Sequence, residues 1–224
     1  YSQLSLMDSV GSGKFTGTGH AAANGGVIMG TGTGIFNMYS GTLSRTVKSG
    51  EAMKNVLVGG ILYAPSGSST NVYGGTIRDG ISASVSAKKN VSKGGNISAE
   101  GSFTMTAGAL IGGKAYTNSY ILQDTTNPIL NSSGNATTYT GTGGNLYVSG
   151  VATITGGHLV DGNAGYGGNL YASSTAKLSI DGAVIRGGVA DETAGTVDPE
   201  YNLSMNGGNL YIAGSSSKRQ NAER

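Results

Sequence analysis

Acidic residues are the first candidates for chemistry in this 224-residue chain. Hydrolysis of a polysaccharide needs two carboxyl groups roughly 5–10 Å apart, and a calcium-dependent lyase needs an acidic cluster with a basic residue that accepts a proton. The chain has 12 Asp and Glu, and the sets Asp191–Glu192 and Asp198 with Glu200 lie in a stretch rich in Gly and Ala. No Asp pair falls within one strand-like segment. We therefore predict no catalytic residue, no metal site and no enzymatic activity.

Other residues that serve catalysis or cofactor binding are also scarce. The chain has no Cys, which excludes a thiol enzyme and a cysteine-ligated metal site, and its two His are His20 and His158. Gly-x-Gly tracts such as Gly30–Gly34 do not join a strand to a helix, so they do not indicate nucleotide binding. The formal net charge is only +2, and no apolar run approaches the ~20 residues that span a bilayer. We expect no cofactor, no nucleic-acid partner and no membrane span in this segment.

Two polar residue types recur at fixed positions after paired glycines. The string Gly-Gly-Asn-Leu-Tyr begins at Gly143, Gly167 and Gly207, and weaker copies begin at Gly25, Gly59 and Gly94. The repeated Asn positions are Asn96, Asn145, Asn169 and Asn209. The repeated Tyr positions are Tyr63, Tyr147, Tyr171 and Tyr211. The shortest distance between copies, from Gly143 to Gly167, gives a minimal unit of 24 residues.

Each unit contains three short segments in which apolar and polar residues alternate, separated by Gly. Alternation with a period of two predicts β-strands, and a 24-residue unit with three strands corresponds to one coil of a parallel β-helix. Stacked coils place equivalent residues above one another, so three apolar columns are expected. The first contains Ile28, Leu62, Ile97, Leu146, Leu170 and Leu210. The second contains Phe36, Phe103, Ala152 and Leu178, with Met38, Val72, Met105, Ile154 and Ile180 beside them. The third contains Leu43, Ile77, Leu110, Leu159 and Val184.

The longer units differ from the minimal one mainly after the third strand-like segment. The expected insertions are 45–58, 81–93, 114–142 and 189–206, and their common position in the repeat predicts loops on one side of the solenoid. We expect residues 1–214 to form a single β-helical domain with partial first and last coils. Residues 215–224 are polar and predict a C-terminal tail.

The repeats carry a family resemblance. Gly-Gly-Asn-Leu-Tyr and the pattern Phe-Thr-Met-Thr-Ala-Gly at 103–108 resemble the repeats of right-handed parallel β-helix proteins in the pectin-lyase-like superfamily. They are most similar to repetitive surface proteins and autotransporter-adhesin-like proteins of bacteria, over about residues 25–214. The resemblance implies a right-handed solenoid that is secreted or held at the cell surface.

The polar columns are expected on the outside of the solenoid and suggest two roles. The stacked Asn side chains are expected to hydrogen-bond from coil to coil as a structural ladder that stabilises turns. The Tyr residues form a stripe, interrupted by Met29 and Ser98, that either stacks on sugar rings or packs only against itself or an inserted loop. Asp161 and Arg186 are expected to form a surface ion pair between adjacent coils.

Two functions follow from these patterns. The first is an extracellular structural or adhesive segment, because the chain repeats without a catalytic cluster and residues 207–213 supply only the first strand of a sixth coil. Open coil ends are sheet edges that recruit another chain, so head-to-tail self-association into filaments is expected, with glycans or a host surface as further partners. The second is a polysaccharide-binding module, or a polysaccharide lyase or hydrolase of the pectin-lyase-like type. Its site would lie along insertions such as 114–142.

Overall fold

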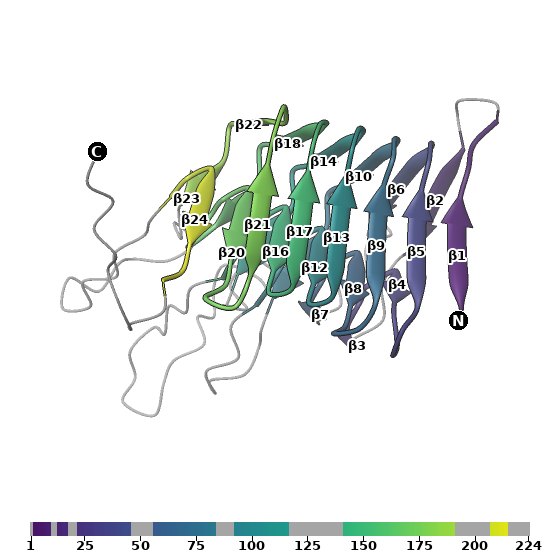
Figure 1. Cartoon of the computed structure of the whole chain (residues 1–224), viewed down its shortest axis with the longest axis horizontal. Coiled ribbons are helices and arrows are strands. Elements are labelled where there is room, and N and C mark those ends of the chain that lie inside the picture. The colour runs from purple at the N-terminus through teal and green to yellow at the C-terminus, as the bar shows by residue number, and fades with distance from the viewer. Residues whose placement is uncertain are drawn as a thin grey trace, which may run out of the picture.

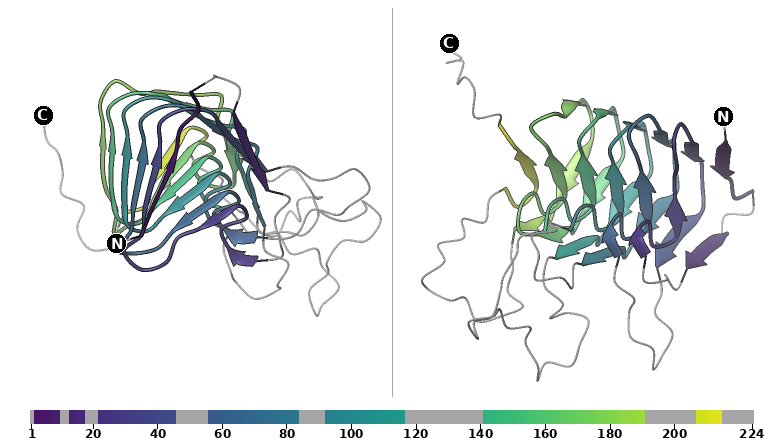
Figure 2. Two further views of the ribbon diagram at one scale, coloured as in Figure 1. Left: turned by 90° about the vertical axis from the view of Figure 1, so that its right-hand side faces the viewer. Right: turned by 90° about the horizontal axis from the view of Figure 1, so that it is seen from below.

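The fold is a solenoid of parallel β-strands (Figure 1). The computed structural model of the chain describes residues 2–9, 13–17, 22–45, 56–83, 92–116, 141–190 and 207–214. Within these residues every regular element is a strand, and the paired strands run parallel. Viewed along the axis from the N-terminal end, the chain turns clockwise as it recedes, so the coils are right-handed (Figure 2). The predicted all-β, parallel β-helical fold is confirmed.

Three six-stranded sheets, one four-stranded sheet and one two-stranded pair form the walls. Sheet 1 follows the Gly-Gly corners and contains β4 (Ile28–Met29), β8 (Leu62–Ala64), β12 (Ile97–Ala99), β16 (Leu146–Val148), β20 (Leu170–Ala172) and β24 (Leu210–Ile212). Sheet 2 contains β1 (Gln3–Leu6), β5 (Ile35–Met38), β9 (Ser69–Val72), β13 (Ser102–Met105), β17 (Val151–Ile154) and β21 (Lys177–Ile180). Sheet 3 contains β2 (Lys14–Gly17), β6 (Thr42–Arg45), β10 (Thr76–Arg78), β14 (Ala109–Ile111), β18 (His158–Val160) and β22 (Val184–Arg186). Sheet 4 contains β11 (Ile81–Ala83), β15 (Lys114–Tyr116), β19 (Asn163–Ala164) and β23 (Val189–Ala190), and the pair consists of β3 (Ala22–Asn24) and β7 (Val56–Val58).

Equivalent residues of successive coils lie directly above one another. Leu146 pairs with Ile97 on one side and with Leu170 on the other, and Leu170 pairs with Leu210. In sheet 2, Phe103 lies between Thr70 and Ala152. The first and second predicted apolar columns are therefore present, and their central members are fully buried.

The third apolar column differs at its last member. Leu159 pairs with Ile185, whereas Val184 pairs with His158 on the outer surface. Val184 is exposed, while Ile185 packs against the core. The predicted place of Val184 in this column is wrong. The two coils have the same spacing between sheets 2 and 3, since Ile154 pairs with Ile180 and His158 with Val184, so Gly182 aligns with Gly156 and the inward position falls on Ile185.

Sheet 4 was not predicted from the repeat pattern, which indicated three strands per unit. Its strands β11, β15 and β23 occupy the first residues of segments that the sequence assigned to insertions. The coils that begin at Gly59, Gly94, Gly143 and Gly167 therefore each have a fourth short strand. The described chain leaves this sheet at Ala83, Tyr116 and Ala190, in agreement with insertions on a single side, whereas the first insertion leaves at Arg45, the end of β6 in sheet 3; the insertions themselves lie mostly outside the described residues.

The Gly-Gly corners bring consecutive coils into close contact. Gly143 has a φ of 67°, which an L side chain rarely adopts. Its neighbour Gly144 lies against the next coil so closely that a Cβ atom would collide with the carbonyl oxygen of Gly168. These two requirements explain why paired glycines recur at the start of each coil.

A second corner also needs a left-handed backbone. Asp79 and Asp161 adopt φ angles of 63° and 55° where neighbouring coils have Gly112 and Gly187. Asp tolerates this conformation better than most residues, because its short polar side chain can bond locally. Arg186 aligns with Val160 rather than with Asp161. The expected Asp161–Arg186 ion pair is not among the ion pairs of the described residues, so that prediction is wrong.

The buried columns predict a contrast between two truncations. Leu110→Ala removes a fully buried side chain from the third column and should lower the free energy of unfolding by about 2–5 kcal/mol. Val151→Ala, at a side chain that is 52% exposed, should cost less than about 0.5 kcal/mol. Urea unfolding followed by circular dichroism would measure both changes, and equal effects would contradict the assignment of the core.

Candidate functional site

The repeated Asn side chains form a continuous hydrogen-bonded ladder. The Nδ2 atom of Asn96 donates to Oδ1 of Asn145 at 2.7 Å, Asn145 donates to Asn169 at 2.6 Å, and Asn169 donates to Asn209 at 2.9 Å. Asn145 and Asn169 thus each accept from the coil before and donate to the coil after. The register predicted from the sequence brings all four residues together.

Each Asn also bonds the corner between sheets 3 and 4. Oδ1 of Asn145 accepts from the Gly113 N–H at 2.8 Å, and its Nδ2 donates to the Val160 carbonyl at 2.8 Å. Asn169 makes the equivalent bonds to Gly162 N–H and the Arg186 carbonyl. The side chain therefore supplies an acceptor for the glycine N–H at this corner, and a second donor for a carbonyl that already accepts from the backbone of the preceding coil.

The ladder lies inside the solenoid. Asn96, Asn145 and Asn169 are fully buried, whereas the sequence analysis treated them as an outer column. That assignment is corrected, and the reason is that a buried corner needs donors and acceptors more than it needs apolar contact. The two N-terminal coils have Val27 and Ile61 at this position, and the ladder ends at the exposed Asn209.

The Tyr positions share one register on the outer face of sheet 1. Tyr147 and Tyr171 stack with ring centroids 5.5 Å apart and planes 8° apart, and Tyr171 and Tyr211 stack at 5.3 Å and 10°. Both faces of the Tyr171 ring are therefore covered by other Tyr rings. The surface that remains consists mainly of ring edges and hydroxyl groups.

Tyr63 is separated from this stack by Ser98, which pairs with Tyr63 in β8 and Tyr147 in β16. A charged pair bridges the gap. The Tyr63 hydroxyl donates to Oε2 of Glu100 at 3.0 Å, Glu100 lies 3.9 Å from Lys93 Nζ, and Lys93 lies 4.8 Å from the centre of the Tyr147 ring. The four predicted Tyr residues thus form one network, completed by two charged side chains that the sequence analysis did not identify.

The residue immediately before a Gly-Gly pair also contacts the Tyr stripe, and the sequence analysis did not identify this position. Lys93 and Tyr166 occupy this position in their coils and are joined through Thr142 by single-residue bridges. Each contacts the Tyr of the following coil: Lys93 lies over Tyr147, and Tyr166 packs on Tyr211 at 5.1 Å with a 54° tilt. A second pair, Tyr39 and Tyr73, stacks at 5.1 Å on the outer side of sheet 2.

Burial and charge alter the phenol groups of the stripe. Loss of hydration, followed by the hydrogen bond to Glu100 and its negative charge, raises the pKa of Tyr63 from its usual value of 10.0 to about 12. Burial also raises the pKa of Tyr171, with smaller contributions from Tyr147, Tyr211 and Tyr166. These two Tyr hydroxyls therefore remain protonated at physiological pH.

The remaining titratable groups of the described residues form no cluster that could hold a metal ion: these ranges contain no group of three or more His, Asp or Glu side chains so arranged. The same ranges contain no helix of the length and hydropathy needed to cross a bilayer. His158 is exposed on β18, and His20 lies outside the described residues.

Comparisons with known proteins identify no relatives: no family model, no curated protein and no solved structure matches this chain.

The ladder predicts unequal costs for two Asn substitutions. Asn145→Ala leaves the Gly113 N–H without its acceptor, removes one of the two donors to the Val160 carbonyl and breaks the links to both neighbouring amides, and should lower the free energy of unfolding by at least about 3 kcal/mol. Asn71→Ala removes a single, partly buried hydrogen bond to Asn37 and should cost about 1 kcal/mol. Urea unfolding provides the measurement, and similar values for the two variants would count against a structural ladder.

The raised pKa of Tyr63 predicts alkaline destabilisation. Because the folded protein holds the phenol proton more tightly than the unfolded chain, the Tyr63 contribution is complete below pH 10 and is lost as pH rises to about 12. Glu100→Gln should lower the pKa of Tyr63, and Tyr63→Phe should remove its share of the pH dependence. Phenolate absorbance and urea unfolding across this range would test both. An unchanged Tyr titration in Glu100→Gln would refute the role of the carboxylate.

Proposed function

We propose that this chain is a structural and adhesive segment of an extracellular or cell-surface β-helical protein, and that its coil ends join other coils. We also propose that it belongs with the repetitive bacterial surface proteins of the pectin-lyase-like superfamily. The stacked Gly-Gly-Asn-Leu-Tyr corners support this placement, because the recurring residues form the interior ladder and the outer stripe of one right-handed solenoid.

One observation carries the structural role: at both ends of the described solenoid, the last strands have no further strand paired to them among the described residues, and apolar side chains are exposed there. Leu4 and Phe15 on β1 and β2 are exposed at the N-terminal end, and Ile180 on β21 is exposed at the C-terminal end. An edge strand offers a row of free backbone donors and acceptors, and apolar residues on it favour pairing with another strand.

The polysaccharide-binding or polysaccharide-cleaving alternative has weaker support. Stacking on a sugar needs an exposed aromatic face, and both faces of Tyr171 are used by Tyr147 and Tyr211. The exposed pair Tyr39 and Tyr73 is likewise stacked on itself. The insertion 114–142, where such a site was expected, falls mostly outside the described residues.

Two assays separate these functions. Electron microscopy of the purified chain should show rods or filaments, and incubation with pectins, alginates and host glycans should release no reducing or unsaturated ends. Binding to a glycan without turnover would agree with an adhesive role. Release of reducing or unsaturated sugar ends, in proportion to protein concentration and time, would overturn the proposal in favour of an enzyme.

A further inference from the structure

We propose that copies of this chain stack head to tail in one fixed register, in which β24 of one copy and β1 and β2 of the next complete a single shared coil. This inference rests on the end-to-end association proposed above and specifies its partner, a second copy, and its geometry.

The two ends of the described solenoid have complementary steps. At the N-terminal end, sheets 2 and 3 begin with β1 and β2, before the first strand of sheet 1, β4. At the C-terminal end, sheet 1 continues to β24, one strand beyond β21 and β22. One end therefore lacks the sheet 1 strand of a coil, and the other end supplies that strand without its sheet 2 and sheet 3 companions (Figure 1).

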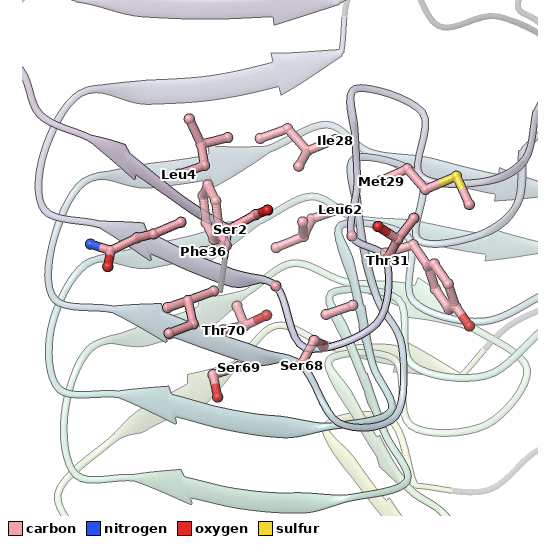
Figure 3. A pocket seen from close by; sticks show the side chains of 16 residues that line it. Ser2, Leu4, Ile28, Met29, Thr31, Phe36, Leu62, Ser68, Ser69 and Thr70 are labelled. Carbon is pink, nitrogen blue, oxygen red and sulfur yellow. The ribbon is translucent and has the colours of Figure 1, made fainter.

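The missing strand leaves a hollow at the N-terminal end. A cavity of about 210 Å³ lies between β1 and β4. Figure 3 shows Leu4 and Ile28 at its mouth, with Phe36 and Leu62 one coil further in. In the stacked arrangement Leu210 of the preceding copy lies over Ile28 and fills this apolar space.

The inward-facing columns continue across the junction. Extending the observed register by one coil sets Leu178 over Leu4 and Ile180 over Leu6 in sheet 2. The same extension sets Ile185 over Phe15 in sheet 3. Each of these three pairs thus brings two apolar residues together. The inward-facing positions of the described coils are also mainly apolar, with Thr70 between Phe36 and Phe103 as an exception.

No electrostatic conflict opposes this register. In the stack, Lys177 lies opposite Gln3, Val184 lies opposite Lys14, and Arg186 lies opposite Thr16. None of the three proposed strand pairs sets two charges of the same sign against each other. Like charges directly opposite would have destabilised the contact.

The exposed end of the Asn ladder also finds a partner. In the fifth coil the Arg186 carbonyl accepts from both the Asp161 N–H and Asn169 Nδ2. The next amide, Asn209, donates from Nδ2 to no acceptor among the described residues. In the stack, the carbonyl of Thr16 from the next copy occupies the equivalent position, because Thr16 and Arg186 belong to one column. The shared coil therefore satisfies the last amide.

This contact joins unlike ends, so it does not close on itself and extends into a filament. Six strands per copy in each of sheets 1, 2 and 3, at about 4.8 Å each, give an axial repeat of about 29 Å per copy. No break in the sheets would occur at the junctions.

A disulfide trap tests the register, since the chain has no native Cys. Ser5 and Ser179 are exposed and become direct neighbours in the stack, at a spacing that a disulfide can span. The S5C/S179C variant should form covalent multimers on oxidation, separated by reductant on a gel. The matched variant S5C/T153C places its thiols two coils apart and should remain uncross-linked. Equal cross-linking of the two variants, or filaments without cross-linking of S5C/S179C, would overturn this register.

A mixing experiment tests the polarity. Phe15→Asp places a charge on the N-terminal end, and Ile180→Asp places one on the C-terminal end, at side chains that are 49% and 36% exposed. Burying an unpaired carboxylate is costly, so each variant alone should need at least a tenfold higher concentration to assemble. Mixed together, they should form a one-to-one dimer through their intact ends. Tyr73→Asp, at an exposed aromatic in the middle of the solenoid, is the control that should assemble normally.

The outcomes separate this inference from the proposed function. Homodimers of either end variant would show contacts between like ends and refute the head-to-tail arrangement, while the structural role could stand. Wild-type monomers at high concentration, with native circular dichroism, would show that the ends are capped and would refute both the stack and end-to-end joining. Turnover of a glycan would refute the structural function without affecting the cross-linking result.

Discussion

Hydrogen bonding between parallel strands at a fixed spacing is the constraint on which the rest of this molecule depends. Because each coil pairs residue by residue with the next, every side chain has a neighbour of the same register above and below. A slip of one residue in a strand would turn its inward-facing side chains outward and its outward-facing side chains inward. The recurring Leu, Asn and Tyr are consequences of this requirement: each type is retained because it makes favourable contacts with a copy of itself.

The same constraint explains how a chain with 41 Gly maintains a buried polar column. The Gly-Gly corners allow successive turns to approach so closely that no side chain fits between them. This close contact buries backbone N–H and carbonyl groups that need hydrogen-bond partners. The Asn side-chain amides provide such partners from inside the solenoid. Gly and Asn are thus coupled: the glycines permit the contact, and the amides satisfy the donors and acceptors that it would otherwise bury.

The sequence was sufficient for the fold and for the register of most columns, because identical strings recur at short intervals. It was insufficient in the turn before β22, where Gly182-Ala183-Val184 fits the Gly-x-aliphatic pattern but the strand pairing places Ile185 at the core position. Val184 and Ile185 are both apolar, so only the hydrogen bonding of the strands decides that Ile185 faces the core. Sheet 4 was missed because its two- and three-residue strands share no motif. The interior position of the Asn ladder, and the charged bridge at Ser98, depend on contacts between residues from different coils that a linear repeat does not reveal.

The coil between Gly143 and Gly167 has no insertion, and this has a consequence for how the chain folds. Closing it orders 24 residues, whereas the coil before it, from Gly94 to Gly143, spans about twice as many. Each doubling of a loop adds about 0.6 kcal/mol of entropic cost to its closure. Nucleation is therefore favoured at the fourth and fifth coils, from which order spreads toward both ends by adding one neighbour at a time.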